Sequence, residues 1–342
     1  MTKTDMKKTV LVTGSGGFVG FATTKALLQQ GHQVRAFELR NSPYVSHLKA
    51  LAECNEQLTV IEGDITHKRD IQEAIGNATH IVHSAALLNS IAPRETFYRI
   101  NVEGARNAME VALENNIERF LLVSTSDVFG IPQANEVITE NTPYRPWQEP
   151  YADTKIQACE LVKQFHRARG LEYTIIYPGW VYGPGDKQFF PAIEEMLNDK
   201  HVFLWHHHEP YQIDFIYISD LVAAICNALF NPQAANEDYL ILNEHARFTP
   251  QAVFQWMADY LSIPIKVHKL PYSLMMLIAK TSQWLTQKGI TKQHLLSTTD
   301  VKAFGNNFRF STQKAQEQLD WQPVVNETDG FTAYFSWAKQ AK

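Results

Sequence analysis

The chain has 342 residues, of which 45% are hydrophobic and 20% are charged, and its formal net charge is −5 at pH 7. This length and composition are typical of a globular protein with one large domain or two packed lobes, and they exclude intrinsic disorder. The acidic balance provides no positive field for a polyanion, which argues against nucleic acid as a partner.

The cysteines and the apolar stretches indicate the cellular compartment of the protein and whether it spans a membrane. Cys54, Cys159 and Cys226 are widely spaced, without a CxxC motif. An odd cysteine count and an amino terminus without a signal-like pattern predict a reduced, cytoplasmic protein. The longest apolar stretch, residues 274–279, stops at Lys280 and is shorter than the roughly 20 residues of a membrane helix. We therefore expect neither disulfides nor an integral membrane span.

Strand and helix patterns alternate through the first half of the chain. The first expected strand, Thr9–Val12, leads into a helix from Phe18 to Gln30 that ends at Gly31. The strands expected after that helix are 33–37, 58–61, 81–84 and 120–123. Short apolar runs separated by amphipathic helices are typical of strands covered on both faces. The pattern predicts an α/β fold of the Rossmann type, with a doubly wound parallel sheet.

The carboxyl half loses this alternation after residues 182–186, regains it near 213–229, and ends in helical and irregular segments rich in aromatic residues. We expect residues 1–185 and about 213–244 to form the NAD(P)-binding Rossmann domain. Residues from about 186 to 212 and from 245 to 342 would form a smaller, mostly helical substrate-binding lobe, packed against the first domain with a cleft between them.

Three glycines stand where the first strand turns into the first helix. Gly14, Gly17 and Gly20 allow a tight turn, a close approach of backbone to a pyrophosphate, and a helix amino terminus that faces its charge. Glu38, at the end of the next strand, is placed to accept hydrogen bonds from ribose hydroxyls. Its carboxylate would repel a 2′-phosphate, so we expect NAD, with NADP as the less favoured cofactor. Arg40, two residues on, is either an alternative partner for that phosphate or simply ion-paired.

Tyr151 and Lys155 lie one helical turn apart and supply a proton-transfer group. An ammonium beside the phenol is expected to lower the pKa of Tyr151 by about two units, so that the phenolate can accept an alcohol proton. Hydride then passes to the nicotinamide, while a hydroxyl from residues 123–126 holds the developing carbonyl oxygen.

The ordered motifs resemble the extended short-chain dehydrogenases/reductases, the NAD-dependent epimerase/dehydratase family, over about residues 8–230. The closest branch is that of the 3β-hydroxysteroid dehydrogenase-like and sterol dehydrogenase proteins. The motifs that carry the resemblance are Thr13-Gly14-x-x-Gly17-Phe18-x-Gly20, Gly63-Asp64-Ile65, His83-Ser84-Ala85-Ala86, Asn101-Val102-x-Gly104, Val123-Ser124-Thr125-Ser126, Tyr151-x-x-x-Lys155 and Pro178-Gly179-Trp180-Val181.

The resemblance implies roles for individual residues. The catalytic hydroxyl would belong to Thr125, with Ser126 as the alternative, beside Tyr151 and Lys155. Asn101 would order backbone and water behind the tyrosine. The implied cofactor contacts extend from the adenine to the nicotinamide: Gly14, Gly17, Phe18, Val19, Glu38, Asp64, Ile65, Ala85, Ala86, Tyr151, Lys155, Pro178 and Val181.

The resemblance also implies a homodimer, formed through the helices around residues 101–115 and 151–169. One departure concerns Tyr177, which stands where relatives commonly carry an arginine before Pro178. The polar or ion-pair role of that arginine is therefore in doubt for this chain.

The substrate remains open between two classes. An epimerase would hold a nucleotide diphosphate with basic side chains, for which Lys187, Lys200, Arg247 and Arg309 are candidates. The apolar stretch 270–285 resembles the cap of steroid and sterol dehydrogenases, although a helix packed on its own lobe would have the same pattern. We favour a hydrophobic, steroid-like secondary alcohol or ketone, and keep a nucleotide-sugar epimerase with tightly bound NAD as the alternative.

Three other functions are disfavoured. Dehydration needs an acid and a base beside the threonine, and Ser126-Asp127 supplies half of that pair. A sensing scaffold without catalysis would not need the intact Tyr151 and Lys155. Neighbouring side chains of the histidine run 206–208 diverge, and the hydride step needs no ion, so we predict no metal site.

Overall fold

The computed structural model describes residues 7–88, 92–197, 200–205, 214–244, 249–291, 296, 298, 301–302 and 305–341. Its strands are β1 (Thr9–Thr13), β2 (Gln33–Leu39), β3 (Leu58–Gly63), β4 (His80–His83), β5 (Arg119–Val123), β6 (Tyr173–Pro178), β7 (Trp180–Tyr182), β8 (His201–Trp205), β9 (Phe215–Tyr217), β10 (Glu237–Ile241) and β11 (Lys266–Leu270). Its α-helices are α1 (Phe18–Gln29), α2 (Val45–Glu53), α3 (Lys68–Ile75), α4 (Arg94–Phe97), α5 (Gly104–Glu114), α6 (Pro150–Arg169), α7 (Phe189–Met196), α8 (Ile218–Phe230), α9 (Pro250–Leu261), α10 (Tyr272–Gln287), α12 (Gln313–Leu319) and α13 (Glu327–Ala341). Shorter turns are the π-helical η2 (Tyr98–Glu103) and the 3₁₀-helical η3 (Ser126–Phe129) and η5 (Pro232–Ala234).

A seven-stranded parallel sheet forms the larger part of the molecule, in the order β10-β6-β5-β4-β1-β2-β3. From β1 the chain builds outward through β2 to β3, then returns to β4 on the other side of β1. Parallel sheets of this kind leave a crevice at the carboxyl ends of the strands where the direction of winding reverses. The crevice of this sheet therefore lies beyond the ends of β1 and β4.

Alternate side chains of the strands feed two hydrophobic cores, one on each face of the sheet. Leu11 and Phe120 pack with residues of α3, α5 and α6, whereas Val12 and Leu121 pack with residues of α1, α2, α8 and α12. Every residue of β1, β4, β5 and β6 is buried. Burial on both faces explains the short apolar runs at the centres of these strands.

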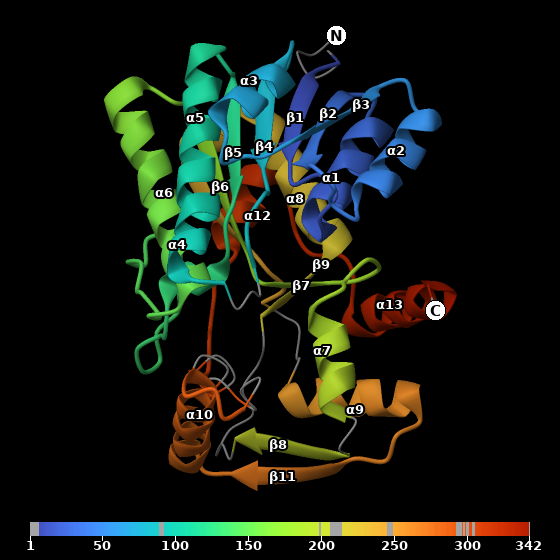
Figure 1. The fold of residues 1–342 in the computed structure, drawn as a ribbon, viewed down its shortest axis with the longest axis vertical. Coiled ribbons are helices and arrows are strands. Elements are labelled where there is room, and N and C mark those ends of the chain that lie inside the picture. The colour runs from blue at the N-terminus through green and yellow to red at the C-terminus, as the bar shows by residue number, and fades with distance from the viewer. Residues whose placement is uncertain are drawn as a thin grey trace.

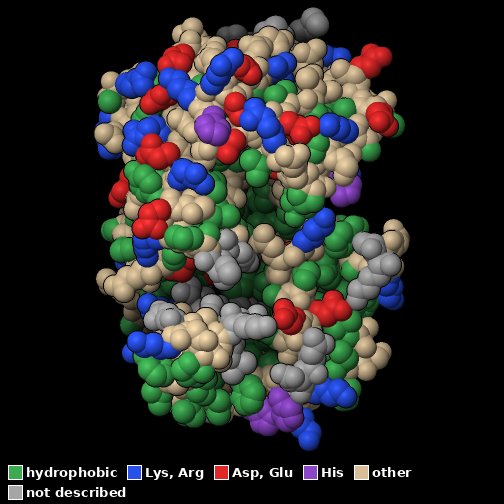
Figure 2. Space-filling model, in the orientation of Figure 1, with side chains coloured by type: hydrophobic (Ala, Val, Ile, Leu, Met, Phe, Trp, Pro, Cys, Tyr) green, Lys and Arg blue, Asp and Glu red, His purple; other side chains and the backbone are tan. Residues whose placement is uncertain are grey.

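A smaller group of elements lies at the end of the molecule opposite the amino terminus, where β8, β11, α9 and α10 are gathered (Figure 1). Strands β8 and β11 pair in parallel, and a third core, rich in aromatic residues, joins this group to α7 and α13. The surface drawn in Figure 2 is hollowed where the sheet meets these lower elements. Helix α12 packs back against α8 and β10 of the large sheet.

The predicted Rossmann-type sheet is confirmed. The five strands and the first helix expected from the sequence are present with ends shifted by one or two residues, and β6 and β10 complete the sheet from the carboxyl half. Most of the stretch 270–285 lies in the helix α10 (Tyr272–Gln287), with Met275 and Ala279 packed into the third core. Among the described residues, no helix has the length and apolarity needed to cross a membrane.

Candidate active site

The loop between β1 and α1 is built so that only glycine fits at key positions. Gly14 has a φ of +67°, and a Cβ there would lie 2.7 Å from the Cα of Ala85 across the crevice. A Cβ on Gly20 would overlap the carbonyl oxygen of Gly14. No side chain caps the amino terminus of α1 at Gly17. The backbone N–H groups that begin this helix, those of Phe18 and Val19 included, therefore suit an anion such as a pyrophosphate.

Glu38 lies at the end of β2, beside this loop. Its side chain is 8% exposed, and Oε2 accepts a hydrogen bond of 2.8 Å from the backbone N–H of Gly16. Arg40, in contrast, forms a 3.0 Å ion pair with Asp70. The carboxylate thus lies against the dinucleotide loop, while the cation that could have met a 2′-phosphate is held by another acid.

The residues expected at the adenine end follow β3. The Oδ1 atom of Asp64 accepts hydrogen bonds from the backbone and the hydroxyl of Thr66, and its own N–H donates to Asp70. Ile65 is buried against Gly104 at the start of α5. Asp64 is therefore fixed in a turn at the same edge of the sheet as Glu38.

Asn101 fixes the loop that follows β4. Its side chain accepts a hydrogen bond from the N–H of Leu87 at 2.7 Å and donates to the carbonyl of the same residue at 3.1 Å. It also donates to the hydroxyl of Thr154 on α6 at 3.0 Å. Asn101 lies in the π-helical turn η2, and it ties the loop of Ala85 and Ala86 to the helix that carries Tyr151. This arrangement agrees with an ordering role for Asn101.

Helix α6 begins at Pro150, and the carboxylate of Glu149 caps it by accepting hydrogen bonds from the N–H groups of Tyr151 and Ala152. Proline at the first helical position and an acid before it are favourable at a helix amino terminus. Tyr151 thus lies in the first turn, with Lys155 one turn further along the same face. The Glu149-Pro150 pair is the sequence signal by which this cap could have been found, and our sequence analysis missed it.

Lys155 is buried one helical turn after the tyrosine. It is 3% exposed, and its Nζ donates a 2.7 Å hydrogen bond to the carbonyl oxygen of Val123, the last residue of β5. Burial lowers the pKa of Lys155 to about 8. Behind it, His83 is also buried, and burial together with the charge of Lys155 lowers the pKa of His83 to about 3, so this imidazole is neutral at physiological pH.

The pKa of Tyr151 differs from the sequence-based expectation. Burial, followed by the negative charges of Asp127 and Glu149, raises the pKa above its usual value, although a hydrogen bond with Thr125 acts in the opposite direction. The expected lowering by Lys155 is therefore wrong for the protein alone. Desolvation disfavours both the phenolate and the ammonium, and two carboxylates lie near the tyrosine.

Thr125 follows β5 and is 8% exposed. Its hydroxyl donates a hydrogen bond to Oδ2 of Asp127 at 3.0 Å and accepts one from the N–H of the same residue at 3.2 Å. Burial, and to a lesser degree the charge of Glu149, raises the pKa of Asp127 to about 6. Thr125, Tyr151 and Asp127 consequently form one electrostatically coupled group, with the carboxyl group able to titrate near neutral pH.

Pro178 is the last residue of β6, the neighbour of β5, and Val181 lies in β7, which follows it. Tyr177, just before Pro178, is completely buried, and its hydroxyl donates to Asp238 at 2.9 Å and also bonds to the hydroxyl of Tyr144. Lys163 forms an ion pair with Asp238. The sequence left a polar role at this position in doubt, and the contacts of Tyr177 with Asp238 and Tyr144 show that the residue has one.

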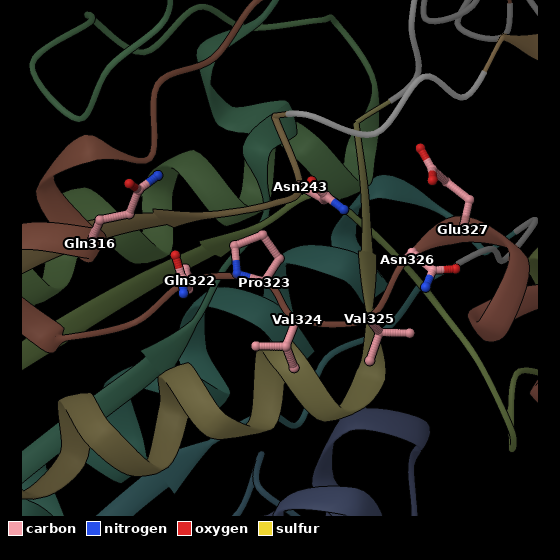
Figure 3. A pocket seen from close by; sticks show the side chains of 8 residues that line it. All are labelled: Asn243, Gln316, Gln322, Pro323, Val324, Val325, Asn326 and Glu327. Atoms are coloured by element: carbon pink, nitrogen blue, oxygen red, sulfur yellow. The ribbon is translucent and has the colours of Figure 1, made fainter.

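A polar pocket beyond the end of β10 does not belong to this constellation (Figure 3). It is lined by Asn243, Gln316, Gln322, Pro323, Val324, Val325, Asn326 and Glu327. None of the residues assigned above to the dinucleotide or to proton transfer lines it.

In the described parts of the chain, no three His, Cys, Asp or Glu side chains are grouped to hold a metal ion. The histidine run 206–208 and Arg247 lie outside the described residues.

Comparison with known proteins identifies the family. Residues 10–241 match the model of the NAD dependent epimerase/dehydratase family. The chain belongs to this family. It is similar to a 3-beta-hydroxysteroid dehydrogenase of Mycolicibacterium neoaurum, which is 26% identical over 94% of this chain and 88% of its own length. The sterol demethylase protein B of Methylococcus capsulatus is 29% identical over 97% of this chain and 98% of its own length.

A similar fold is found in the crystal structure of UDP-glucose 4-epimerase from Thermus thermophilus, in complex with NAD. It has a TM-score of 0.74 and 19% sequence identity, and the match covers 98% of this chain and all of the epimerase chain. The family and the sheet together establish that the protein is an enzyme of the extended short-chain dehydrogenase/reductase type that uses a nicotinamide dinucleotide.

Proposed function

We propose that the protein is an NAD-dependent oxidoreductase that interconverts a secondary alcohol and a ketone on a hydrophobic, steroid-like substrate. The observation that carries this proposal is the grouping of Thr125, Tyr151 and Lys155 at the carboxyl end of β5. The glycine loop lies at the neighbouring end of β1, in the crevice where doubly wound sheets bind dinucleotides.

Each of these side chains has a distinct task in the proposed reaction. The Tyr151 hydroxyl exchanges a proton with the substrate oxygen, the Thr125 hydroxyl binds that oxygen, and Lys155, one helical turn from Tyr151, provides positive charge. The bound nicotinamide accepts or supplies the hydride. The raised pKa of Tyr151 keeps the phenol protonated at neutral pH, which favours proton donation during ketone reduction. Alcohol oxidation would then be faster in alkaline solution.

NAD is the cofactor that we propose, with NADP less favoured. The carboxylate of Glu38 lies beside the dinucleotide loop, and Arg40 is engaged by Asp70. Contacts with the remainder of the cofactor are proposed for the other residues expected from the sequence: Gly14, Gly17, Phe18, Val19, Asp64, Ile65, Ala85, Ala86, Tyr151, Lys155, Pro178 and Val181.

Two observations support an apolar substrate. The relatives named above include a steroid dehydrogenase and a sterol demethylase protein that match nearly the whole chain. Those candidate cations for a diphosphate that the structure describes are also dispersed. Lys187 lies 4.8 Å from the ring centroid of Tyr44 beside the dinucleotide loop, Lys200 precedes β8, and the backbone of Arg309 bonds to Ile138. The resemblance to UDP-glucose 4-epimerase, which is one of fold, keeps the epimerase as the second candidate.

We further propose the division of labour expected from the sequence. Residues 1–185 and about 213–244 bind the cofactor, and residues from about 186 to 212 and from 245 to 342 bind the substrate.

Homodimerisation would use α5 and α6, and light scattering that detects only monomer would refute it. Cys54, Cys159 and Cys226 are free thiols, which supports a reducing, cytoplasmic location.

The decisive experiment offers the purified protein two substrate panels with NAD and with NADP. Hydrophobic secondary alcohols are followed by the absorbance of reduced cofactor at about 340 nm, a property of the nicotinamide chromophore, and nucleotide sugars by product identity. Net NADH formation with an apolar alcohol supports the proposal, whereas an epimerised sugar without net NADH supports the epimerase.

The Tyr151→Phe variant is the control for the proposed chemistry. It should lose turnover but retain NAD binding, because only the phenolic hydroxyl is removed. Full activity of this variant would exclude Tyr151 as the proton-transfer group.

A further inference from the structure

Helix α10 has apolar residues on two opposite faces. Met275 and Ala279 are buried in the third core, at 3% and 0% exposure. On the opposite side, Leu274, Leu277 and Trp284 are 41%, 61% and 51% exposed. Helical spacing of three, seven and ten residues aligns these three side chains in one stripe. Figure 2 shows hydrophobic side chains gathered over α10 at the lower end of the molecule.

The exposed stripe is accompanied by positive charge. Lys280 and Lys288 fall on the same side of the helix as Leu277 and Trp284, and both lysines are exposed. In the sequence, residues 260–299 contain five lysines and no aspartate or glutamate, although the whole chain carries a net charge of −5. Just beyond the helix, Ile290 is 64% exposed. We call the set Leu274, Leu277, Lys280, Trp284, Lys288 and Ile290 the α10 face.

We propose that the α10 face docks on the surface of an anionic lipid bilayer. Helices that lie in the membrane interface combine an apolar stripe containing Trp and Leu with lysines, and their binding increases with anionic lipid. The long stems of Lys280 and Lys288 would follow the apolar stripe while their ammonium groups reach lipid phosphates. The helix would lie along the surface, with Met275 and Ala279 still packed in the protein.

The charges of the α10 face disfavour a second copy of the chain as the occupant. A symmetric dimer brings the same patch of both copies together. Lys280 and Lys288 of the two copies would then meet without an acidic residue from residues 260–299 between them. An anionic bilayer instead provides apolar depth and negative charge together. Docking would place the lower elements of the molecule against lipid, and it does not depend on the proposed reaction.

The test is flotation of the full chain with vesicles. Vesicles of phosphatidylcholine that contain phosphatidylglycerol should carry the protein, vesicles of pure phosphatidylcholine should carry much less, and high salt should release it. Leu277→Glu and Trp284→Glu should each weaken binding roughly 10- to 100-fold, as expected for loss of one buried apolar side chain. Lys280→Gln and Lys288→Gln should each weaken binding roughly fivefold.

Val324→Glu is the matched control, because Val324 is 76% exposed but lines the polar pocket beyond β10 and is not part of α10. Its binding to vesicles should equal that of the unaltered protein. The unfolding midpoint of Leu277→Glu should also be unchanged, because the side chain is on the surface. Failure of the unaltered protein to float with anionic vesicles, or equal flotation of Leu277→Glu, would overturn the proposal. Conversion of a dimer to a monomer by Leu277→Glu would instead identify a subunit interface.

Discussion

The hydroxyl of Thr125 donates its hydrogen to the carboxylate of Asp127, with 3.0 Å between Oγ1 and Oδ2. A threonine hydroxyl has a single hydrogen, so Thr125 cannot donate to a substrate oxygen while Asp127 is ionised. Once Asp127 is protonated, the carboxyl group can donate to Thr125 and free the threonine hydrogen. The protonation state of Asp127 therefore determines whether Thr125 acts as a donor.

The first prediction concerns the pH dependence of ketone reduction. The pKa of Asp127 is raised to about 6 by burial and by Glu149, so protonated Asp127 is lost as the pH rises through that value. We expect kcat/KM for reduction to fall several-fold between pH 5 and 7 as Thr125 ceases to donate. In Asp127→Asn this decrease should disappear, because an amide does not titrate. The measurement is the pH profile of NADH oxidation with a ketone substrate.

Ser126→Ala is the control for this profile. Ser126 lies between Thr125 and Asp127 in the sequence and is the alternative oxygen-binding hydroxyl. Its removal should leave the decrease near pH 6 in place. A profile abolished by Ser126→Ala but kept by Asp127→Asn would assign the oxygen-binding role to Ser126.

The second prediction is that Lys155 is needed for turnover but lowers the free energy of unfolding of the protein. Its pKa is lowered from 10.5 to about 8 by burial, so the charged form is disfavoured in the folded state and stability is lost as the pH falls from 10.5 to 8. Removing the charge in Lys155→Met should raise the free energy of unfolding at pH 7 by about 3 kcal/mol. Loss of the hydrogen bond to the carbonyl of Val123 should lower it by about 1 kcal/mol. We expect a net gain of about 2 kcal/mol in the free energy of unfolding, with loss of turnover.

Urea unfolding at pH 7 and at pH 10.5 checks this prediction, and the gain should shrink at the higher pH. Lys163→Met on the same helix is the comparison, because Lys163 is paired with the buried carboxylate of Asp238. This variant should be destabilised at pH 7, since it leaves that charge without its cation. Equal behaviour of the two variants would contradict the assigned cost of burying Lys155.

Much of the fold was predictable because its signals are local in the sequence. The run Thr9–Val12 before Gly14 fixes a strand, a turn and a helix within a dozen residues. The spacing of Tyr151 and Lys155 places both on one face of a helix. The short apolar runs of the strands, separated by helices, indicate burial on both faces and predict the parallel sheet.

The electrostatics of the site could not be predicted in the same way. The direction of the Tyr151 pKa depends on burial and on Asp127, a residue 24 positions away in the sequence. The hydrogen bonds of Asn101 reach Leu87 and Thr154, which the fold alone brings together. Likewise, α10 has apolar residues on two opposite faces, and only the tertiary structure shows that Met275 faces the core and Leu277 faces solvent.

The third prediction separates two glycines by what a methyl group would meet. In Gly20→Ala the new Cβ would overlap the backbone carbonyl of Gly14, which cannot move without opening the turn. In Gly104→Ala it would lie 2.7 Å from Cδ1 of Ile65, the end of a side chain that can rotate. We expect Gly20→Ala to lose NAD binding by more than tenfold, and Gly104→Ala to retain it within a few-fold. Isothermal titration with NAD distinguishes the two, and equal losses would contradict the steric argument.

The last prediction concerns cofactor choice. Replacing Glu38 with Ser removes a carboxylate that would repel a 2′-phosphate, and it also removes the acceptor for the Gly16 N–H. The loss of hydrogen bonds to a charged group should reduce kcat/KM with NAD roughly 10- to 100-fold. Activity with NADP should rise only modestly in Glu38→Ser, because Arg40 remains paired with Asp70 at 3.0 Å. Asp70→Ala added to Glu38→Ser should release Arg40 for the phosphate and increase kcat/KM with NADP further. If Asp70→Ala has no such effect in that background, Arg40 does not reach the phosphate and the preference for NAD depends on Glu38 alone.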